Sequence, residues 1–225
     1  MDAPTTDPGT PQRESSNLSA RAYLLIEEAI VTLRLDPGTT VTESDLCRLI
    51  GLGRTPVREA VQKLAADGLI QIYPRRGLVI PPISASEMQA VLEVRSPLER
   101  IIAAHAARRG SESERRALRR LGGLMETAAS RDNPDAYMAH DKAIDRSLAQ
   151  MSRSEYAVKA CMPLQVMSRR YWYLHWRHAD LMAAARHHLR LIDAVADGET
   201  QAARQAVDNL MSHLASRVAA HSVTN

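Results

Sequence analysis

Residues 41–80 decide the fold, and they read VTESDLCRLIGLGRTPVREAVQKLAADGLIQIYPRRGLVI. Thr42, with Asp45 three residues later, has the pattern of a helix capping box, and the helix that it begins ends at Gly51-Leu52-Gly53. A second helix follows directly, and its apolar side chains share one face: Val57, Ala60, Val61 and Leu64. This part of the chain therefore predicts two short helices separated by a tight glycine turn.

The second half of this stretch is typical of a small β-ribbon. Ile70 and Ile72 alternate with polar neighbours, Pro74-Arg75-Arg76-Gly77 forms a turn, and Leu78-Val79-Ile80 returns. Upstream, helical spacing of apolar residues predicts one more amphipathic helix, with its stripe at Ala22, Leu25, Ile26, Ala29, Ile30 and Leu33. Three short helices followed by a ribbon predict a winged helix-turn-helix domain over residues 17–80.

The polar face of the third helix carries arginine. If its apolar face packs inward, Arg54, Thr55 and Arg58 project outward near the helix N-terminus, where recognition helices meet base edges. A guanidinium group can pair with both O6 and N7 of guanine in the major groove. Arg75 and Arg76 at the ribbon tip are expected to reach phosphates or an adjacent minor groove. Each arginine alone fits a solvated surface equally well, but the set predicts an interface with double-stranded DNA.

Five motifs follow one another closely in this region: Leu35-Asp36-Pro37-Gly38, Val41-Thr42-Glu43-Ser44-Asp45-Leu46, Gly53-Arg54-Thr55-Pro56-Val57-Arg58-Glu59-Ala60-Val61, Asp67-Gly68-Leu69-Ile70 and Pro74-Arg75-Arg76-Gly77. Together they resemble the signature of the GntR family of bacterial transcription regulators. The resemblance implies that Ser44 contacts a phosphate and that Gly77 belongs to the DNA-contacting wing. Gly53 departs from the Ser or Thr usual in the family, which removes a side-chain cap and a phosphate contact.

Composition sets the boundaries of the two domains. Residues 1–16 are rich in Pro, Thr, Ser and Asp without helical apolar spacing, which predicts a disordered tail. Residues 81–83 begin with two prolines and are expected to form a stiff linker. From residue 84 to 221 every signal is helical, which predicts a bundle of about six helices, with two pieces or a kink at Pro163. Helix starts are marked by Ser84 with Glu87, Ser111 with Glu114, and Asn133-Pro134.

Several polar residues interrupt the predicted buried stripes of this bundle. Asp141 lies between apolar residues on one stripe, Asp145 follows one turn later, and His188 occupies a buried position on another helix. Two buried carboxyl groups one turn apart repel each other and need a cation, a metal or a proton. Together with Arg95, they predict either a ligand site or a satisfied core network, in which Arg95 neutralises an acid and His188 bonds to the backbone.

The helical region resembles, more loosely, the FCD ligand-sensing domain of the FadR subgroup of GntR regulators. The resemblance depends on Leu92-Glu93-Val94-Arg95, the helix around Asp141, and the run His187–Val195. It implies a homodimer, a palindromic operator, and control by a small carboxylated metabolite, often beside a bound divalent metal. Arg95, Asp141, Asp145 and His188 are then the expected effector-binding residues.

The same resemblance implies one divalent metal ion: Zn, Mn, Mg or Ca. Metal-binding members of the family supply an Asp, a His four residues later, a His at position 188 and another His near the end of the last helix. This chain has Asp145 at the second of these positions and Leu210 at the last. The implied ligands are therefore Asp141, Asp145, His188 and, after a shift of one turn, His213.

The whole chain of 225 residues has 45% hydrophobic and 24% charged residues, as expected of a globular protein. No apolar run is long enough to span a membrane, and the N-terminus lacks the pattern of a signal peptide, so a cytoplasmic protein without membrane contact is expected. Cys47 and Cys161 lie far apart, which argues against a disulfide framework or a zinc finger. The basic residues of the chain are almost all arginine. Either arginine is used because it binds phosphate and guanine well, or a GC-rich genome favours arginine codons.

Three functions fit these patterns. The first is a dimeric DNA-binding transcription regulator, a repressor or an activator, whose operator binding responds to a small carboxylate. The second is an architectural DNA binder with a helical dimerisation domain that senses nothing. The third is a metal-dependent enzyme centred on Asp141 and His188, which lacks a nucleophile motif and a phosphate-binding loop, so we expect no enzyme. The aromatic cluster at residues 171–178 fits a pocket, a dimer face or simple packing.

Overall fold

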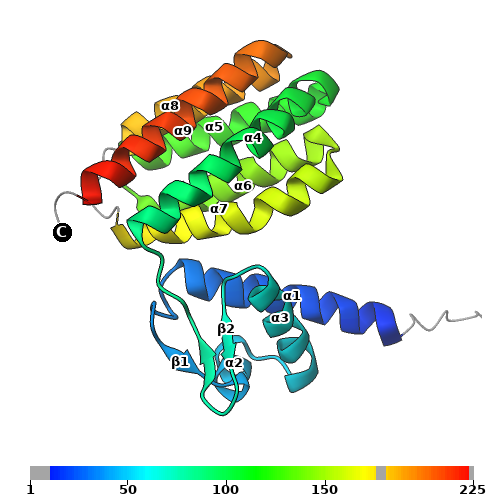
Figure 1. The fold of residues 1–225 in the computed structure, drawn as a ribbon. Helices are drawn as coiled ribbons and strands as arrows, with labels where there is room; N and C mark the ends of the chain where they lie inside the picture. Colours follow the sequence, from blue (N-terminus) through cyan, green and yellow to red (C-terminus); the bar gives the residue numbers. More distant parts are fainter. Residues whose placement is uncertain (1–10, 176–180, 223–225) are drawn as a thin grey trace, which may run out of the picture. The chain divides into compact units, whose positions relative to one another are not determined.

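The structure is a computed structural model that describes residues 11–175 and 181–222 (Figure 1). The chain divides into two compact units, Met1–Pro82 and Ile83–Asn225, and each is described by itself. None of the helices in the described ranges is both long and apolar enough to cross a bilayer.

Within its described residues, the first unit consists of three helices and a three-stranded antiparallel sheet (Figure 1). The helices are α1 (Pro11–Val31), α2 (Glu43–Ile50) and α3 (Arg54–Ala66), and the strands are β1 (Thr40–Val41), β2 (Gln71–Tyr73) and β3 (Gly77–Val79). The strands lie in the order β1-β3-β2, with Val41 and Ile72 both opposite Leu78. This arrangement confirms the predicted winged helix-turn-helix fold.

Strand β1 was not predicted, because a strand of two residues is too short to show an alternating pattern. The backbone N–H of Gly38 donates to the carbonyl of Ile80 over 2.7 Å, and the N–H of Ile80 donates to the carbonyl of Thr39 over 3.0 Å. These bonds continue the pairing of β1 with β3. The wing is therefore attached to the segment that follows α1.

Local sequence explains where α2 and α3 begin. The predicted capping box is present at α2, because the N–H of Asp45 donates to Thr42 Oγ1 over 3.1 Å and the N–H of Thr42 donates to Asp45 Oδ2 over 2.9 Å. Helix α2 ends at Gly51, whose left-handed backbone (φ 67°) favours glycine. Helix α3 begins after Gly53, which has no side chain to accept a capping hydrogen bond. Its buried face packs on α1 through the core side chains Ala22, Ile26, Ile30, Val57, Val61 and Leu64.

The start of α1 corrects the expected tail. We expected disorder from residue 1 to 16, but α1 begins at Pro11, so residues 11–16 are helical and residues 1–10 lie outside the described residues. Pro is well tolerated at the first helical position, and Gln12, Arg13 and Glu14 have good helix propensity. These residues extend a helix whose later turns are anchored by packing, without contributing apolar spacing of their own.

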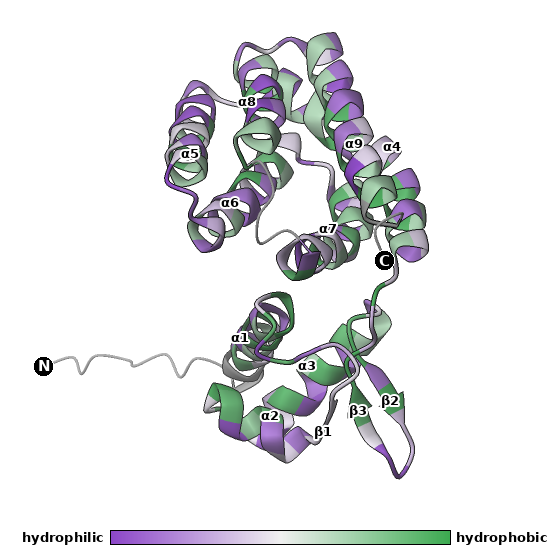
Figure 2. Cartoon of the chain, turned by 90° about the vertical axis from the view of Figure 1, so that its left-hand side faces the viewer, coloured by the Kyte–Doolittle hydropathy of each residue, from purple (hydrophilic) through white to green (hydrophobic). Residues whose placement is uncertain are grey.

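The second unit contains six helices within its described residues, which agrees with the predicted all-helical bundle. They are α4 (Ala85–Arg109), α5 (Glu112–Ser130), α6 (Pro134–Ser152), α7 (Glu155–His175), α8 (Leu181–Ala196) and α9 (Thr200–Ser222). Helix α4 is central, because it packs against α6, α7, α8 and α9, while α5 packs on α6 and α8. Figure 2 shows green and purple residues on each of these helices, so their apolar faces are available to form a shared core.

Helix α7 is continuous through Pro163. The sequence predicted two pieces or a kink, and a single helix runs from Glu155 to His175 with Pro163 inside it, so the alternative of two pieces is wrong. A proline leaves the carbonyl of the preceding turn without its intrahelical partner. Lys159, one turn earlier, is exposed, so water can solvate its carbonyl group. The helix therefore continues across the proline.

Candidate nucleic-acid interface and buried polar cluster

Helix α3 presents its polar residues to solvent. Arg54, Thr55 and Arg58 are exposed, whereas the side chains that alternate with them at helical spacing are fully buried: Val57, Ala60, Val61 and Leu64. Ser44 is exposed in the first turn of α2, two residues after the capping residue Thr42. The four polar side chains that the sequence singled out on these two helices are thus accessible to a partner.

The guanidinium of Arg58 is held by an acid that sequence reasoning missed. Its Nε lies 3.3 Å from both carboxylate oxygens of Glu43 on α2, and its Nη2 lies 3.2 Å from Glu43 Oε2. The hydrogen bond from Arg58 to Glu43 raises the pKa of Arg58 above its ordinary value, so the group stays positively charged. Glu43 lies in the quoted motif of α2, but only the packing of α2 against α3 brings it to Arg58.

The wing tip is a tight turn with two exposed arginines. Arg75 has a left-handed backbone (φ 65°), and the N–H of Arg76 donates to the carbonyl of Tyr73 over 3.1 Å. Gly77 has φ 97°, and a Cβ atom there would lie 3.0 Å from the carbonyl oxygen of Val41. Glycine at this position therefore lets β3 approach β1 closely, which is a structural reason for Gly77 beside the expected contact with DNA.

In the second unit, charged residues from four helices meet in one buried cluster. Asp141 and Asp145 come from α6, Arg169 from α7 and His188 from α8, and the ion pair of Arg95 with Glu99 comes from α4. Arg169 Nη1 lies 2.6 Å from Asp145 Oδ2 and 3.7 Å from Asp141 Oδ2. His188 Nε2 lies 3.1 Å from Asp141 Oδ1. We refer to these six residues as the polar cluster.

Arg95 does not neutralise Asp141 by direct contact. Its Nε donates to Glu99 Oε1 over 2.7 Å, and the same oxygen accepts a hydrogen bond from Gln165 over 3.0 Å. The arginine that faces both Asp141 and Asp145 is instead Arg169, which the sequence pattern did not single out. Two adjacent arginines, Arg169 and Arg170, occur in α7, and no local pattern shows which of them faces the carboxylates.

Both ring nitrogens of His188 face hydrogen-bond acceptors. Nδ1 lies 3.0 Å from the carbonyl oxygen of Ala184 and 3.2 Å from the hydroxyl of Tyr137, while Nε2 faces Asp141. Burial lowers the pKa of His188, but the hydrogen bond to Asp141 and the charge of that carboxylate outweigh it and raise the pKa above its ordinary value. The geometry therefore suits the protonated imidazolium form of His188. The hydrogen bond from Nδ1 to the carbonyl of Ala184 is the bond to the backbone that the core-network alternative predicted.

The pKa values of the two carboxyl groups of α6, Asp141 and Asp145, are shifted in opposite directions. Burial raises the pKa of Asp141, but the hydrogen bond from His188, together with the charges of His188 and Arg169, brings that pKa below its ordinary value. Burial and the neighbouring charges of Asp141 and Glu99 raise the pKa of Asp145 above its ordinary value, in spite of Arg169. Environment alone thus separates the two acids, as expected for like charges in one buried site.

A small cavity of about 20 Å³ lies against the cluster. Arg95, Asp141, Arg169 and His188 line it, together with Ser168 and apolar or aromatic side chains from α6, α7 and α9: Tyr137, Met138, Trp172 and Leu214. Ser168 Oγ and Arg169 Nε are buried without a hydrogen-bond partner. A cavity of this size holds about one water molecule. A carboxylate group therefore enters only if the surrounding helices move apart.

The residues present do not fit the divalent metal that the resemblance implied. His213 lies outside the polar cluster, since its ring stacks on that of His187 at a centroid distance of 4.5 Å. Leu210 is buried and cannot ligate. Within residues 11–175 and 181–222, no group of three or more His, Cys, Asp or Glu side chains is arranged to hold a metal ion. The carboxylates that would bind one are engaged by Arg169 and His188.

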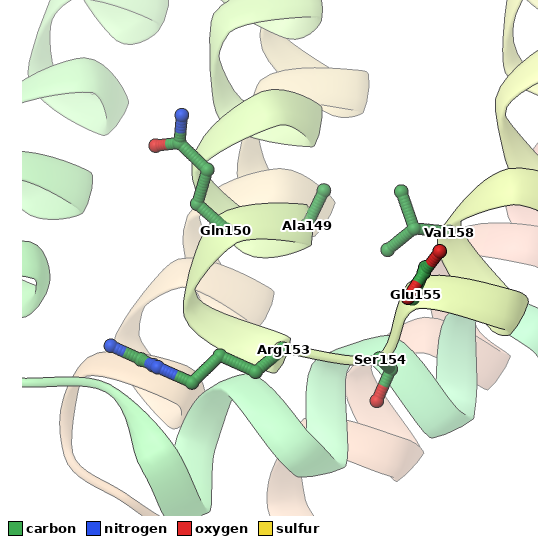
Figure 3. Close-up of a pocket in the computed structure, with 6 residues that line it drawn as sticks. All are labelled: Ala149, Gln150, Arg153, Ser154, Glu155 and Val158. Carbon is green, nitrogen blue, oxygen red and sulfur yellow. The ribbon is translucent and has the colours of Figure 1, made fainter.

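A larger hollow of about 390 Å³ lies where α6 ends and α7 begins. Figure 3 shows Ala149 of α6 and Val158 of α7 beside the gap between the two helices, with the side chain of Arg153 directed away from it. Gln150, Arg153 and Glu155 around it are exposed, so it is a surface groove. It contains none of the residues that the sequence singled out.

The aromatic cluster expected at residues 171–178 is described only as far as His175. Tyr171 is fully buried and meets Trp172 edge to face, with the ring centroids 5.2 Å apart. Its ring also lies 4.5 Å from that of His175. Tyr171 and Trp172 both pack in the core, and Trp172 also lines the small cavity. Trp176 and His178 lie outside the described residues.

Both units match models of known families. Residues 18–80 match the family of bacterial regulatory proteins called the gntR family, and residues 90–213 match the FCD domain. The chain belongs to the GntR family with an FCD domain. Members of this family are transcription regulators, not enzymes, and the FCD domain is their effector-binding domain. This GntR–FCD protein is therefore a DNA-binding transcription regulator, as predicted.

Individual relatives agree with this assignment. The GntR–FCD protein is 34% identical over 104 residues to an HTH-type regulator from Agrobacterium vitis, which covers 46% of this chain and 61% of that protein. It is 26% identical over 202 residues to the HTH-type transcriptional repressor RspR of Escherichia coli, which covers 89% of each chain. The solved structure of E. coli McbR/YncC matches with a TM-score of 0.80 at 16% identity, over 91% of this chain and 98% of that one, and shows the shared fold.

Proposed function

We propose that this GntR–FCD regulator is a homodimeric repressor of the FadR subgroup that acts in the bacterial cytoplasm. In this proposal residues 17–80 read a palindromic operator, residues 81–83 act as a linker, and residues 84–221 sense an effector and dimerise. Support comes from the membership of the family and from the repressor RspR, which aligns along most of the chain. A single reading helix covers only a few base pairs, so a second half-site is needed to define a site in a genome.

The DNA contacts that we propose are divided between base edges and phosphates. Arg54, Thr55 and Arg58 of α3 read bases in the major groove, because all three are exposed on the face opposite the core. Ser44 and the wing tip, with Arg75, Arg76 and Gly77, contact phosphates or the minor groove. Exposed arginine on both elements is the observation that carries this part of the proposal.

The effector that we propose is a small carboxylated metabolite bound beside the polar cluster. The supporting observation is the cavity lined by Arg95 and Arg169, in which a buried guanidinium nitrogen and the hydroxyl of Ser168 lack a partner. A guanidinium group offers two parallel donors to a carboxylate, and a buried donor without an acceptor is costly. In this proposal the ligand is surrounded by Arg95, Asp141, Asp145 and His188. The carboxylate of the ligand replaces one of the internal carboxylates as the partner of a guanidinium group.

A thermal-shift screen against small mono- and dicarboxylic acids tests this proposal. A bound effector raises the melting temperature of the native state and changes the affinity for operator DNA. Arg95→Lys is expected to lose both responses while it keeps the fold and operator binding, because an ammonium group cannot reproduce the paired donors.

Two controls decide between a sensor and an inert dimerisation domain. Full effector response in the double variant Arg95→Ala, Asp141→Ala would remove the pocket from the proposal. Absence of any stabilising acid in the wild-type protein would favour the architectural DNA binder, for which the small size of the cavity already offers some support. Elution of the effector by denaturation of freshly purified protein identifies a ligand that the screen omits.

A further inference from the structure

We propose that Arg169 is a built-in cation that takes the place of a divalent metal ion in this FCD domain. Some members of the family bind such a metal, and the ligand positions of this chain suggested one as well. The structure instead places a guanidinium group from α7 between the two carboxylates of α6. This inference concerns the assembly of the helical unit and does not depend on the identity or existence of an effector.

Both carboxylates of the expected site already face N–H groups. Arg169 Nη1 lies 2.6 Å from Asp145 Oδ2 and 3.7 Å from Asp141 Oδ2, while His188 Nε2 lies 3.1 Å from the other oxygen of Asp141. A metal ion bound by Asp141, Asp145 and His188 would displace Arg169 Nη1 and take the place of the proton on His188 Nε2, and it would adjoin a charged guanidinium. Metal and Arg169 therefore exclude each other.

Burial makes the choice of cation important for stability. The side chain of Arg169 is 7% exposed, and those of Asp141 and Asp145 are each 12% exposed. Buried carboxylates need a compensating charge, and removal of one partner of a buried pair is strongly destabilising. An arginine side chain remains protonated over the pH range in which proteins are folded, and a chelator cannot remove it as it removes a metal ion. The counter-ion of the two carboxylates of α6 is therefore a side chain of α7, and it is covalently part of the protein.

The other two positions that the family uses for metal ligands do not supply a ligand either. Leu210 is 1% exposed and belongs to the apolar core, and the ring of His213 stacks on His187. Arg95 adds a second guanidinium within the cluster and is paired with Glu99. The cluster as a whole contains three basic side chains, those of Arg95, Arg169 and His188, beside three acidic ones.

Melting experiments with metal salts and a chelator test the proposal. For the full-length wild-type protein, we expect the same melting temperature with EDTA, with MnCl2 and with ZnCl2, and no stoichiometric metal by elemental analysis of protein purified without chelator. Arg169→Ala is expected to melt at a lower temperature. Because the substitution frees two carboxylates and an imidazole, added MnCl2 or ZnCl2 is expected to restore part of the loss, and EDTA to reverse the gain.

Two further variants separate this effect from general destabilisation. Arg115 donates to the carbonyl groups of Ala107, Gly110, Val195 and Ala196, outside the polar cluster, so Arg115→Ala is expected to melt lower without any response to metal. Arg169→Lys retains a cation and is expected to remain unresponsive as well. If Arg169→Ala does not fold, the wild-type metal content and the behaviour of Arg169→Lys decide the question.

The outcomes that would overturn the proposal are specific. One is wild-type protein that carries a stoichiometric metal or that melts higher with MnCl2 or ZnCl2 in an EDTA-reversible manner. Another is Arg169→Ala with unchanged melting, or with lowered melting that neither metal restores. None of these outcomes bears on DNA binding or on the carboxylate effector, which are measured separately.

Discussion

Individual arginines of the first unit are expected to make unequal contributions to DNA recognition. Arg54→Ala and Arg58→Ala should each weaken operator binding by about 1–3 kcal/mol, because each removes a donor pair that a guanine edge accepts. Arg75→Ala and Arg76→Ala should weaken operator and random DNA alike and reduce the salt dependence of binding, because phosphate contacts carry no sequence information. Binding isotherms on both DNAs at several salt concentrations measure the difference. Unchanged operator affinity in Arg54→Ala would contradict the assignment of base reading to α3.

Glu43 should act on DNA binding through Arg58. Its carboxylate engages Nε and Nη2 of Arg58 and so restricts the guanidinium to one orientation. In Glu43→Gln we expect a lower ratio of operator to random affinity, since the side chain is less ordered and a negative charge near phosphates is lost. The control is Glu43→Gln combined with Arg58→Ala, in which the two effects on specificity should not add. A ratio that is unchanged by Glu43→Gln would show that the pair does not position Arg58.

Residue patterns singled out four of the six residues of the polar cluster, namely Arg95, Asp141, Asp145 and His188, and missed Glu99 and Arg169. Asp141, Asp145 and His188 lie at regular helical spacing among apolar residues, so their burial is visible in the sequence. Arg169 lies in the run Ser168-Arg169-Arg170-Tyr171, where four consecutive residues are buried and no periodicity distinguishes the inward position. Burial on several sides of α7 is a result of packing between helices, which a single sequence does not encode locally.

At the scale of whole elements, three helices share one mode of initiation, and it makes their stability sensitive to acid. The capping boxes at α2, α4 and α5 each place a carboxylate on backbone and hydroxyl donors. Hydrogen bonds from the Thr42 side chain and backbone lower the pKa of Asp45 to about 2, and bonds from Ser84 and Ser111 lower the pKa of Glu87 and Glu114. Each carboxylate therefore stabilises the folded state above the pKa of the unfolded chain, near 4.

Melting temperatures between pH 6 and pH 2 test this contribution. The stabilisation by the three boxes should be lost as pH falls through the folded-state pKa values, to about 2 for Asp45. Asp45→Asn, Glu87→Gln and Glu114→Gln should each melt lower than wild type at neutral pH and differ less from it in acid. A difference that does not shrink in acid would mean that the lost stability has another origin.

Elements with strong end signals were predicted well, and those without them were not. Capping residues and apolar stripes located α2, α3 and the wing. The early start of α1 depends on residues with good helix propensity but no apolar spacing, and the two residues of β1 depend on pairing with β3. Helix α7 continues through Pro163, where the exposed preceding turn lets water solvate the free carbonyl. Apolar spacing and capping motifs record none of these three features.

For the whole molecule, we expect a dimer joined largely through the helical domain. Sedimentation at micromolar concentration should give a species of about twice the 24.9 kDa mass of the chain, and footprints should cover two half-sites related by a two-fold axis. The FCD domain alone, expressed from residue 84, should give the same association state as the full chain if it contains the interface. A single species near the monomer mass, with a one-sided footprint, would contradict the proposed dimer.

The absence of a side chain at Gly53 has a consequence for the exchange of backbone hydrogens. The first amides of α3 have no acceptor within the helix, and Gly53 supplies none, so Arg54 and Thr55 depend on solvent or on a bound group. In free protein their amide hydrogens should exchange with deuterium rapidly, whereas those of α2, which is capped by Thr42, should be slower. On operator DNA a phosphate oxygen can accept from the start of α3 and slow the exchange there. Recognition would then complete a helix end that the free protein leaves open.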